Sequence, residues 1–304
     1  MVILGPTGAG KSHLALSLAE AFGGEIVNCD SVQVYRGLDI GSAKTPVERR
    51  RGIAHHLLDV VGPGEELTAG SYARMARATV RDIQARGRLP IVAGGTGFYL
   101  RALLDGLSPA PSRNESLRLR LQGMSDRRSG SLHRVLRRFD PPAAARIHPN
   151  DTPKLVRAIE IMLLSGTVVT HAQSAPRDTF KGVRSLKLGL DPDRRQLYCR
   201  LNERAAWMFH NGLIEETQAL LQGGYDSGSK PMQSLGYKQA VQVIGRQMTV
   251  DAAISECQIR TRQYAKRQMT WFRTEQNVDW LPGFGWTADI LDAANRKVAA
   301  FLYD

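Results

Sequence analysis

Cysteine is scarce in this sequence: three residues, Cys29, Cys199 and Cys257, are spread over 304 positions. Their wide spacing matches neither a disulfide framework nor a cluster of metal ligands. No run of about 18 uncharged apolar residues is present, so we expect no membrane-spanning helix. The chain opens with Met1-Val2-Ile3-Leu4-Gly5 and shows no export signal. These absences favour a protein of the reducing cytoplasm.

Acidic residues are also under-represented. The sequence has 29 Asp and Glu against 41 Lys and Arg, which gives a net charge of +12 and a pI of about 10.0. Residues 113–184 contain 14 basic and 6 acidic side chains, and residues 259–273 contain five basic and no acidic ones. A general basic drift would spread this charge evenly. Its clustering favours a polyanionic partner such as nucleic acid.

A glycine-rich motif near the start indicates a phosphate site. The pattern G-x-x-x-x-G-K-[ST] is matched in full by Gly5, Pro6, Thr7, Gly8, Ala9, Gly10, Lys11 and Ser12. The motif lies between an apolar strand and a periodic helix, the context in which its backbone N–H groups surround an anion. Lys11 is expected to bridge phosphate oxygens, and Ser12 to bind Mg²⁺. A nucleotide hydrolase, a kinase and a transferase that releases diphosphate all remain open.

Alternating strands and helices predict an α/β fold. Strands are expected near 2–5, 25–30, 56–61, 89–95 and 184–191, and helices near 11–22, 71–86, 194–212, 214–221, 250–273 and 286–302. With the glycine-rich motif, this pattern predicts a P-loop NTPase-like parallel sheet core with helices on both faces. The Ser- and Pro-rich stretch 108–112 precedes a basic, mainly helical segment. We therefore predict a catalytic core of residues 1–110 and 184–304 and a helical insertion domain of residues 111–183.

Polar residues at strand ends narrow the three classes. The stretch 55–59 is a poor magnesium-binding strand because it contains two histidines, which argues against a hydrolase. Asp30 closes the second predicted strand, where ligands collect in open α/β sheets, so it can accept a proton or serve only as a turn residue. Ser31 and Gln33 follow it. Thr96, after a second glycine pair, is either a helix N-cap or a substrate ligand.

These segments and several others resemble the tRNA dimethylallyltransferase family, also called isopentenyl-diphosphate:tRNA transferases. Besides the glycine-rich motif, the matching stretches are 30–35, 39–44, 56–59, 94–99, 106–109, 145–151, 157–160, 236–239 and 261–268. They occur in the family's order over nearly the whole chain. No zinc finger follows them, so the resemblance is to the bacterial type.

The resemblance implies a reaction and a set of residues. The donor is dimethylallyl diphosphate, and the acceptor is N6 of the adenosine 3′-adjacent to the anticodon in tRNA. Asp30 is implied as the general base and Thr96 as a residue that orients the base or the donor. The diphosphate is implied to bind the glycine-rich motif, Arg204 and a Mg²⁺ ion held by Ser12.

The resemblance also implies contacts to the tRNA anticodon stem-loop. We expect the insertion domain to hold the RNA. We also expect the protein to act as a monomer. The implied contact residues are Asp30, Ser31, Val32, Gln33, Thr96, Arg118, Pro153, Lys154, Leu155, Val156, Arg157, Gln233, Ser234, Leu235, Gly236, Tyr237 and Lys238. Three alternatives stay open: a small-molecule kinase, an enzyme that prenylates free adenine nucleotides, and a non-catalytic RNA-binding switch.

Overall fold

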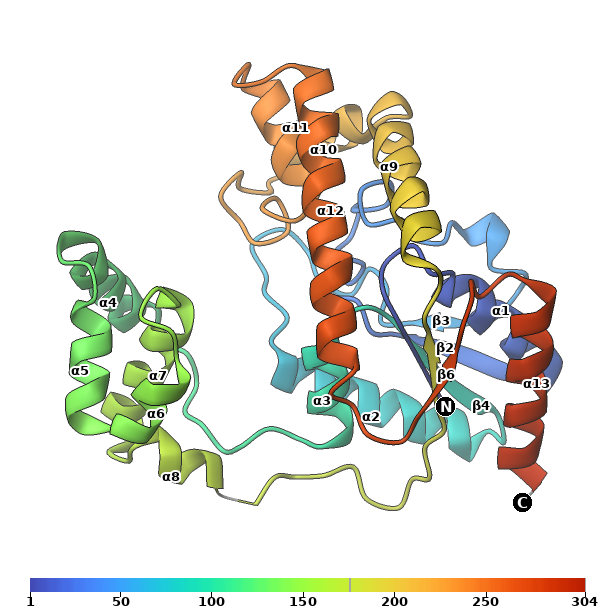
Figure 1. The fold of residues 1–304 in the computed structure, drawn as a ribbon, viewed down its shortest axis with the longest axis horizontal. Helices are drawn as coiled ribbons and strands as arrows, with labels where there is room; N and C mark the ends of the chain where they lie inside the picture. Colours follow the sequence, from blue (N-terminus) through green and yellow to red (C-terminus); the bar gives the residue numbers. More distant parts are fainter. Residues whose placement is uncertain (175, 304) are drawn as a thin grey trace. The chain divides into compact units, whose positions relative to one another are not determined.

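The computed structural model describes residues 1–174 and 176–303. The chain forms two compact units: residues 1–104 together with residues from 180 onward, and residues 105–179 (Figure 1). The predicted insertion, 111–183, overlaps the second unit over residues 111–179. Among the described residues, no helix is long and apolar enough to cross a membrane.

The first unit is built on a six-stranded parallel sheet with the strand order β3-β2-β4-β1-β5-β6. The strands are β1 (Val2–Leu4), β2 (Gly24–Asn28), β3 (His55–His56), β4 (Leu89–Ala93), β5 (Lys187–Leu190) and β6 (Val278–Leu281). β1 is central, paired with β4 on one side and β5 on the other. Because all strands run in parallel, their carboxyl ends meet at one edge, where the glycine-rich motif follows β1.

Helices cover both faces of the sheet, as the sequence predicts. Side chains of a strand alternate between faces, so Ile3 packs with α1 (Lys11–Phe22) and α13 (Ala288–Tyr303). Val2 and Leu4 pack on the other face, in the cluster that includes α2 (Ala69–Ala85), α3 (Gly97–Leu104) and α12 (Val250–Phe272). A sheet buried on both faces explains why these strands read as continuous apolar runs.

Four elements in the carboxyl-terminal part complete this unit. α9 (Arg194–His210) packs against α12, and α10 (Leu213–Gln222) packs against α11 (Tyr237–Ile244) (Figure 1). The sequence predicts α9, α10, α12 and α13 but neither α11 nor β6. Both are short, and β6 has only four residues, Val278-Asp279-Trp280-Leu281, which show little alternation.

The third predicted strand is wrong in its extent. Instead of covering 56–61, β3 contains only His55 and His56. Leu57 and Asp59 have φ angles of 61° and 57°, which no strand residue adopts, so pairing stops after His56. The chain rejoins the sheet edge only through an isolated bridge between Tyr35 and Val61.

In the second unit, all regular structure in residues 105–174 and 176–179 is helical. Its helices are α4 (Glu115–Arg127), α5 (Ser131–Phe139), α6 (Pro141–Arg146), α7 (Thr152–Ser165) and α8 (Val169–Ser174). Three of them have a side-chain N-cap: Asn114 caps α4, Asp140 caps α6 and Asp151 caps α7. A separate apolar cluster around Leu132 and Leu136 forms its core.

Candidate functional site

The glycine-rich motif forms a loop whose shape depends on backbone conformation. Gly5, Gly8 and Gly10 have φ angles of 142°, 81° and 92°, a region that favours glycine. Helix α1 begins directly afterwards at Lys11, so its amino-terminal N–H groups and partial positive charge face the loop. The Lys11 ammonium donates to the carbonyl oxygens of Gly5 (3.0 Å) and Pro6 (2.8 Å). This arrangement is a site for a phosphate chain.

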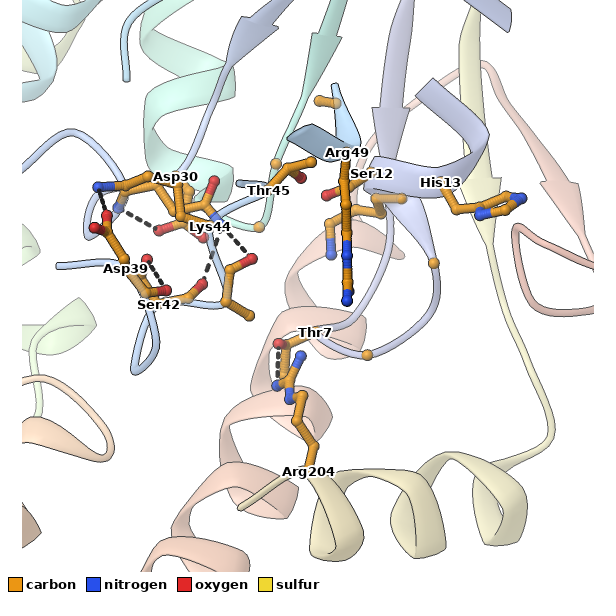
Figure 2. A pocket seen from close by; sticks show the side chains of 18 of the residues that line it. Thr7, Ser12, His13, Asp30, Asp39, Ser42, Lys44, Thr45, Arg49 and Arg204 are labelled. Atoms are coloured by element: carbon orange, nitrogen blue, oxygen red, sulfur yellow. Dashed lines mark hydrogen bonds and ion pairs between the residues drawn. The ribbon is translucent and has the colours of Figure 1, made fainter. Parts of the chain in front are cut away.

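Two cations share this loop. Burial lowers the pKa of Lys11 to about 8; the carboxylate of Asp30 opposes this shift and the Arg204 guanidinium adds to it. Arg204, on α9, donates to Oγ1 of Thr7 (2.8 Å; Figure 2), and burial lowers its pKa as well. An anion bound here would relieve the repulsion between these cations, so the electrostatics favour a polyanionic ligand.

Gln268 connects the phosphate loop to the second glycine-rich turn. Its Oε1 accepts from the backbone N–H of Thr7, and its Nε2 donates to the carbonyl of Gly95, both at 2.8 Å. The side chain is only 5% exposed. A Cβ on Gly95 would come within 2.4 Å of Nε2, so a side chain at this position would displace the Gln268 amide. Gln268 lies in the stretch 261–268 that matches the family, but no sequence pattern indicates this role.

Asp30 lies at the carboxyl end of β2, as predicted, and one of its oxygens is occupied. Oδ1 accepts from the backbone N–H groups of Val32 (2.9 Å) and Gln33 (3.4 Å). Among the described residues, nothing donates a hydrogen bond to Oδ2. Thr96 holds the same turn: its Oγ1 accepts from the N–H of Ser31 (2.9 Å) and donates to Ser31 Oγ (3.2 Å). Thr96 therefore orients the turn that contains Asp30.

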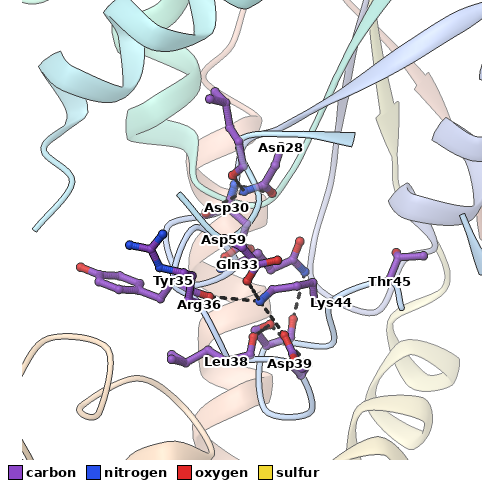
Figure 3. Close-up of polar contacts among 12 residues, drawn as sticks. Asn28, Asp30, Gln33, Tyr35, Arg36, Leu38, Asp39, Lys44, Thr45 and Asp59 are labelled. Carbon is purple, nitrogen blue, oxygen red and sulfur yellow. Dashed lines mark hydrogen bonds and ion pairs between the residues drawn. The ribbon is translucent and has the colours of Figure 1, made fainter. Parts of the chain in front are cut away.

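The segment 39–44 lies next to this turn and is fixed by a buried lysine. The Lys44 ammonium contacts Oδ1 of Asp39 and Oδ1 of Asp59, each at 2.6 Å, and donates to the carbonyl of Tyr35 at 3.1 Å (Figure 3). Gln33 Nε2 donates to the carbonyl of Ser42 at 3.0 Å. Because the lysine side chain is 3% exposed, its charge is balanced almost entirely by these partners.

Glu216 of α10 holds the other side of the segment 39–44. Its Oε2 accepts from the backbone N–H groups of Asp39 (3.2 Å) and Ile40 (2.7 Å), and its Oε1 accepts from Gly41 N–H (3.3 Å). The Tyr237 hydroxyl also donates to Oε1, at 2.6 Å. All four groups donate to Glu216, so both of its carboxylate oxygens act as acceptors here. No sequence pattern marks Glu216, which lies 176 residues from Ile40.

Two cavities border Asp30. The first, about 810 Å³, is lined by the glycine-rich loop, the segment 39–46 and α9 (Figure 2). The second, about 430 Å³, is lined by Ser31 and Val32, by α9 and α12, and by residues 230–236. Thr7, Asp30 and Arg204 line both. A phosphate chain in the first cavity and an acceptor in the second would therefore meet at Asp30.

The predicted RNA-contact residues near the carboxyl terminus divide into three groups. Gln233, Ser234, Leu235 and Gly236 line the second cavity, and Lys238 is exposed. Tyr237 is fully buried and donates its hydroxyl to Glu216, so its side chain does not face solvent. Its place beneath the segment 39–44 makes it a support for that segment.

In the second unit, a buried carboxylate organises the predicted RNA contacts. Glu160, fully buried, pairs with Arg118 (3.2 Å) and Arg157 (2.6 Å). Pro153 and Lys154 are exposed at the start of α7. Leu155 and Val156 are 2% and 3% exposed and belong to the apolar core of this unit, so their side chains are unavailable to RNA.

The Ser12 hydroxyl is the predicted oxygen ligand for a metal at the phosphate loop. Ser12 is exposed and lines the first cavity. Among residues 1–174 and 176–303, no group of three His, Cys, Asp or Glu side chains is arranged to bind a metal. Mg²⁺ keeps several water molecules and binds largely through substrate phosphates, so a single hydroxyl is compatible with it.

The parallel sheet and the loop after its central strand define a P-loop NTPase-like α/β core. Within that class, the family model described as IPP transferase matches residues 33–275. The chain therefore belongs to the IPP transferase family.

Relatives match along nearly the full length of both chains. The tRNA dimethylallyltransferase of Solibacter usitatus is 56% identical, covering 99% of this chain and 98% of its own length. The tRNA dimethylallyltransferase of Koribacter versatilis is 54% identical, covering 98% and 97%.

Solved structures match the fold as well. The tRNA isopentenylpyrophosphate transferase of Bacillus halodurans superimposes with a TM-score of 0.73 at 34% identity, covering 98% of this chain and 95% of its own. A eukaryotic dimethylallyltransferase described as acting on tRNA gives a TM-score of 0.80 at 28% identity, covering 98% and 77%.

Proposed function

We propose that this protein transfers a dimethylallyl group from dimethylallyl diphosphate to N6 of the adenosine 3′-adjacent to the anticodon in tRNA, releasing diphosphate. The names of its full-length relatives support this reaction. The structural observation that carries the proposal is the pair of cavities that share Thr7, Asp30 and Arg204. A transferase needs such a junction because donor and acceptor must reach one point from different sides.

The diphosphate binds in the first cavity. The N–H groups at the start of α1, together with Lys11 and Arg204, provide positive charge where the leaving group gains negative charge. Ser12 would hold a Mg²⁺ ion, which when bound supplies further positive charge to the diphosphate. The carbon–oxygen bond breaks and its electron pair remains on the diphosphate.

The adenine occupies the second cavity. Its N6 lone pair forms the new carbon–nitrogen bond, and one N6 proton passes to Asp30. Oδ2 of Asp30 is suited to accept it because Oδ1 is held by two backbone N–H groups. Thr96 acts through Ser31 by holding the Asp30 turn. An adenine in a stacked loop must leave the stack to reach this position.

Residues of each of the two units would contact the tRNA. Residues 233–236 line the second cavity, where they can contact the target adenine and its neighbours. Ser31, Val32 and Gln33 border Asp30 and can contact the same nucleotides. In the helical unit, Arg118, Pro153, Lys154 and Arg157 would bind the anticodon stem-loop, with Glu160 fixing the two arginines.

Incubation with radiolabelled dimethylallyl diphosphate and unmodified tRNA tests the proposal. We expect label in tRNA, with a loss of about 10³-fold in kcat for Asp30→Asn, because a general base contributes about 10²–10⁴-fold. Asp251→Asn, an exposed aspartate at the start of α12, is the matched control. Label in free AMP, or ATP-dependent phosphorylation, would contradict the proposal. A binding switch would give no product.

A further inference from the structure

Helix α9 presents a second arginine to the phosphate cavity. Arg200 and Arg204 are four residues apart, so they lie on the same face of the helix, and both line the first cavity. Arg204 donates to Thr7. Within residues 1–174 and 176–303, Arg200 forms no ion pair with a carboxylate. The cavity therefore contains a cation whose charge no protein anion neutralises.

An aromatic side chain holds Arg200 instead. Its guanidinium carbon lies 4.1 Å from the centroid of the Trp286 ring, a cation–π distance. Trp286 is itself stacked on Phe284, with centroids 4.5 Å apart and an interplanar angle of 19°. A guanidinium stacked in this way keeps N–H donors at its edges for a phosphate, which a carboxylate partner would have occupied.

Trp286 is packed directly against the phosphate loop. The N–H of Gly285 donates to the carbonyl of Ala9 at 2.9 Å. A Cβ on Gly10 would lie 2.5 Å from the Trp286 ring, so the absence of a side chain at Gly10 allows the contact. The position of Arg200 is thus tied, through Trp286, to the loop that binds the first phosphate.

We infer that Arg200, positioned by Trp286, forms a subsite for the terminal phosphate of the prenyl diphosphate. This inference rests on the proposed function, because it places the second phosphate of that substrate. As the carbon–oxygen bond breaks, negative charge spreads over both phosphates, and a cation on the terminal phosphate stabilises the leaving group. Trp286 is a positioning residue, and Arg200 contacts the substrate.

Titration calorimetry with inorganic pyrophosphate and with orthophosphate, in the presence of Mg²⁺, tests the subsite. Arg200→Gln should raise the Kd for pyrophosphate about tenfold or more and change that for orthophosphate less than about threefold, since only pyrophosphate reaches both subsites. Arg194→Gln is the control: Arg194 is on the same helix and stacks on Tyr198 at 5.1 Å but does not line the cavity. It should change neither Kd.

Variants at Trp286 separate positioning from folding. Trp286→Phe keeps an aromatic face and should bind pyrophosphate nearly as the wild type does. Trp286→Leu should raise the Kd for pyrophosphate as much as Arg200→Gln does. If Trp286→Leu has a much lower melting temperature than the wild type, the Kd values of Arg200→Gln and Trp286→Phe test the subsite instead.

Equal pyrophosphate affinity in Arg200→Gln and wild type would overturn the inference. The inference would also be overturned if Arg200→Gln raised only the KM for tRNA, because Arg200 would then contact the RNA. A wild-type protein that binds no pyrophosphate would instead contradict the proposed function.

Discussion

The two sides of the site are built in different ways. The phosphate wall, residues 5–12, takes its shape from the backbone of consecutive residues and the start of one helix. The acceptor wall, residues 30–33 and 39–44, is held by side chains from distant parts of the chain, Thr96 and Glu216. Its own Lys44 adds an ion pair with Asp59, outside the wall. A local motif can thus specify an anion site, whereas a site for the acceptor depends on the assembled fold.

The largest expected effect lies in the phosphate wall. Lys11→Met removes the ammonium at the mouth of the loop, so kcat/KM for dimethylallyl diphosphate should fall about 10³-fold, because a preorganised charge on the leaving group is lost. Steady-state kinetics at saturating tRNA measure the change. Lys297→Met is the control: this half-exposed lysine of α13 pairs with Asp279 and does not line the phosphate cavity. Retention of more than about a tenth of the activity would show that this wall does not hold the leaving group.

The next effect should arise at Glu216, which contacts no substrate. Both Glu216→Ala and Glu216→Gln should lower kcat/KM about 30-fold. Alanine removes both acceptor oxygens, and glutamine places an N–H donor against a backbone N–H of the segment 39–44. The segment 39–44 lines both cavities, so KM should rise for both substrates. Glu215→Gln, its exposed neighbour, should behave as wild type. If Glu216→Gln retained full activity, the acceptor wall would not depend on this carboxylate.

A smaller effect is expected at Thr96. Thr96→Val removes both hydrogen bonds to Ser31 and should lower kcat about tenfold, while Thr96→Ser keeps the hydroxyl and should restore most of the activity. Single-turnover measurements separate the rate of prenyl transfer from substrate binding. A serine variant as slow as the valine variant would mean that the hydroxyl is not what orients the turn.

The smallest effect is a change in pH dependence. With a pKa of about 8, Lys11 is protonated below that pH and loses its charge above it. For the wild type, kcat/KM for dimethylallyl diphosphate should therefore fall roughly fourfold between pH 7 and pH 8.5. Lys11→Arg stays charged and should lack this fall. The same falling limb in both proteins would assign it to another group.

Much of the fold could be predicted because its determinants are local. Helix α1 was predicted at 11–22 and is found at Lys11–Phe22, since the motif and the apolar periodicity both lie within those residues. Strand β3 was predicted too long because its end depends on positive φ angles at Leu57 and Asp59, which the residue types do not indicate.

The acceptor wall could be predicted only in part. Asp30 and Thr96 stood out because each follows a strand, yet the contact of Thr96 with Ser31 joins residues 65 apart. Nothing in the sequence of α10 distinguishes Glu216 from Glu215; only the fold brings Glu216 to the segment 39–44. The family resemblance supplied residues for RNA binding but not the burial that removes Tyr237, Leu155 and Val156 from the surface.

The link between Thr7 and Gln268 has a consequence for biosynthesis. Translation produces the phosphate loop first, yet the side chain that accepts from its Thr7 amide is added 261 residues later. Likewise, β1 leaves the ribosome before both of its neighbours, β4 and β5. In the nascent chain β1 is therefore unpaired until β4 emerges, and the glycine loop lacks its Gln268 support until α12 emerges. An unpaired strand edge of this kind is exposed to aggregation during synthesis.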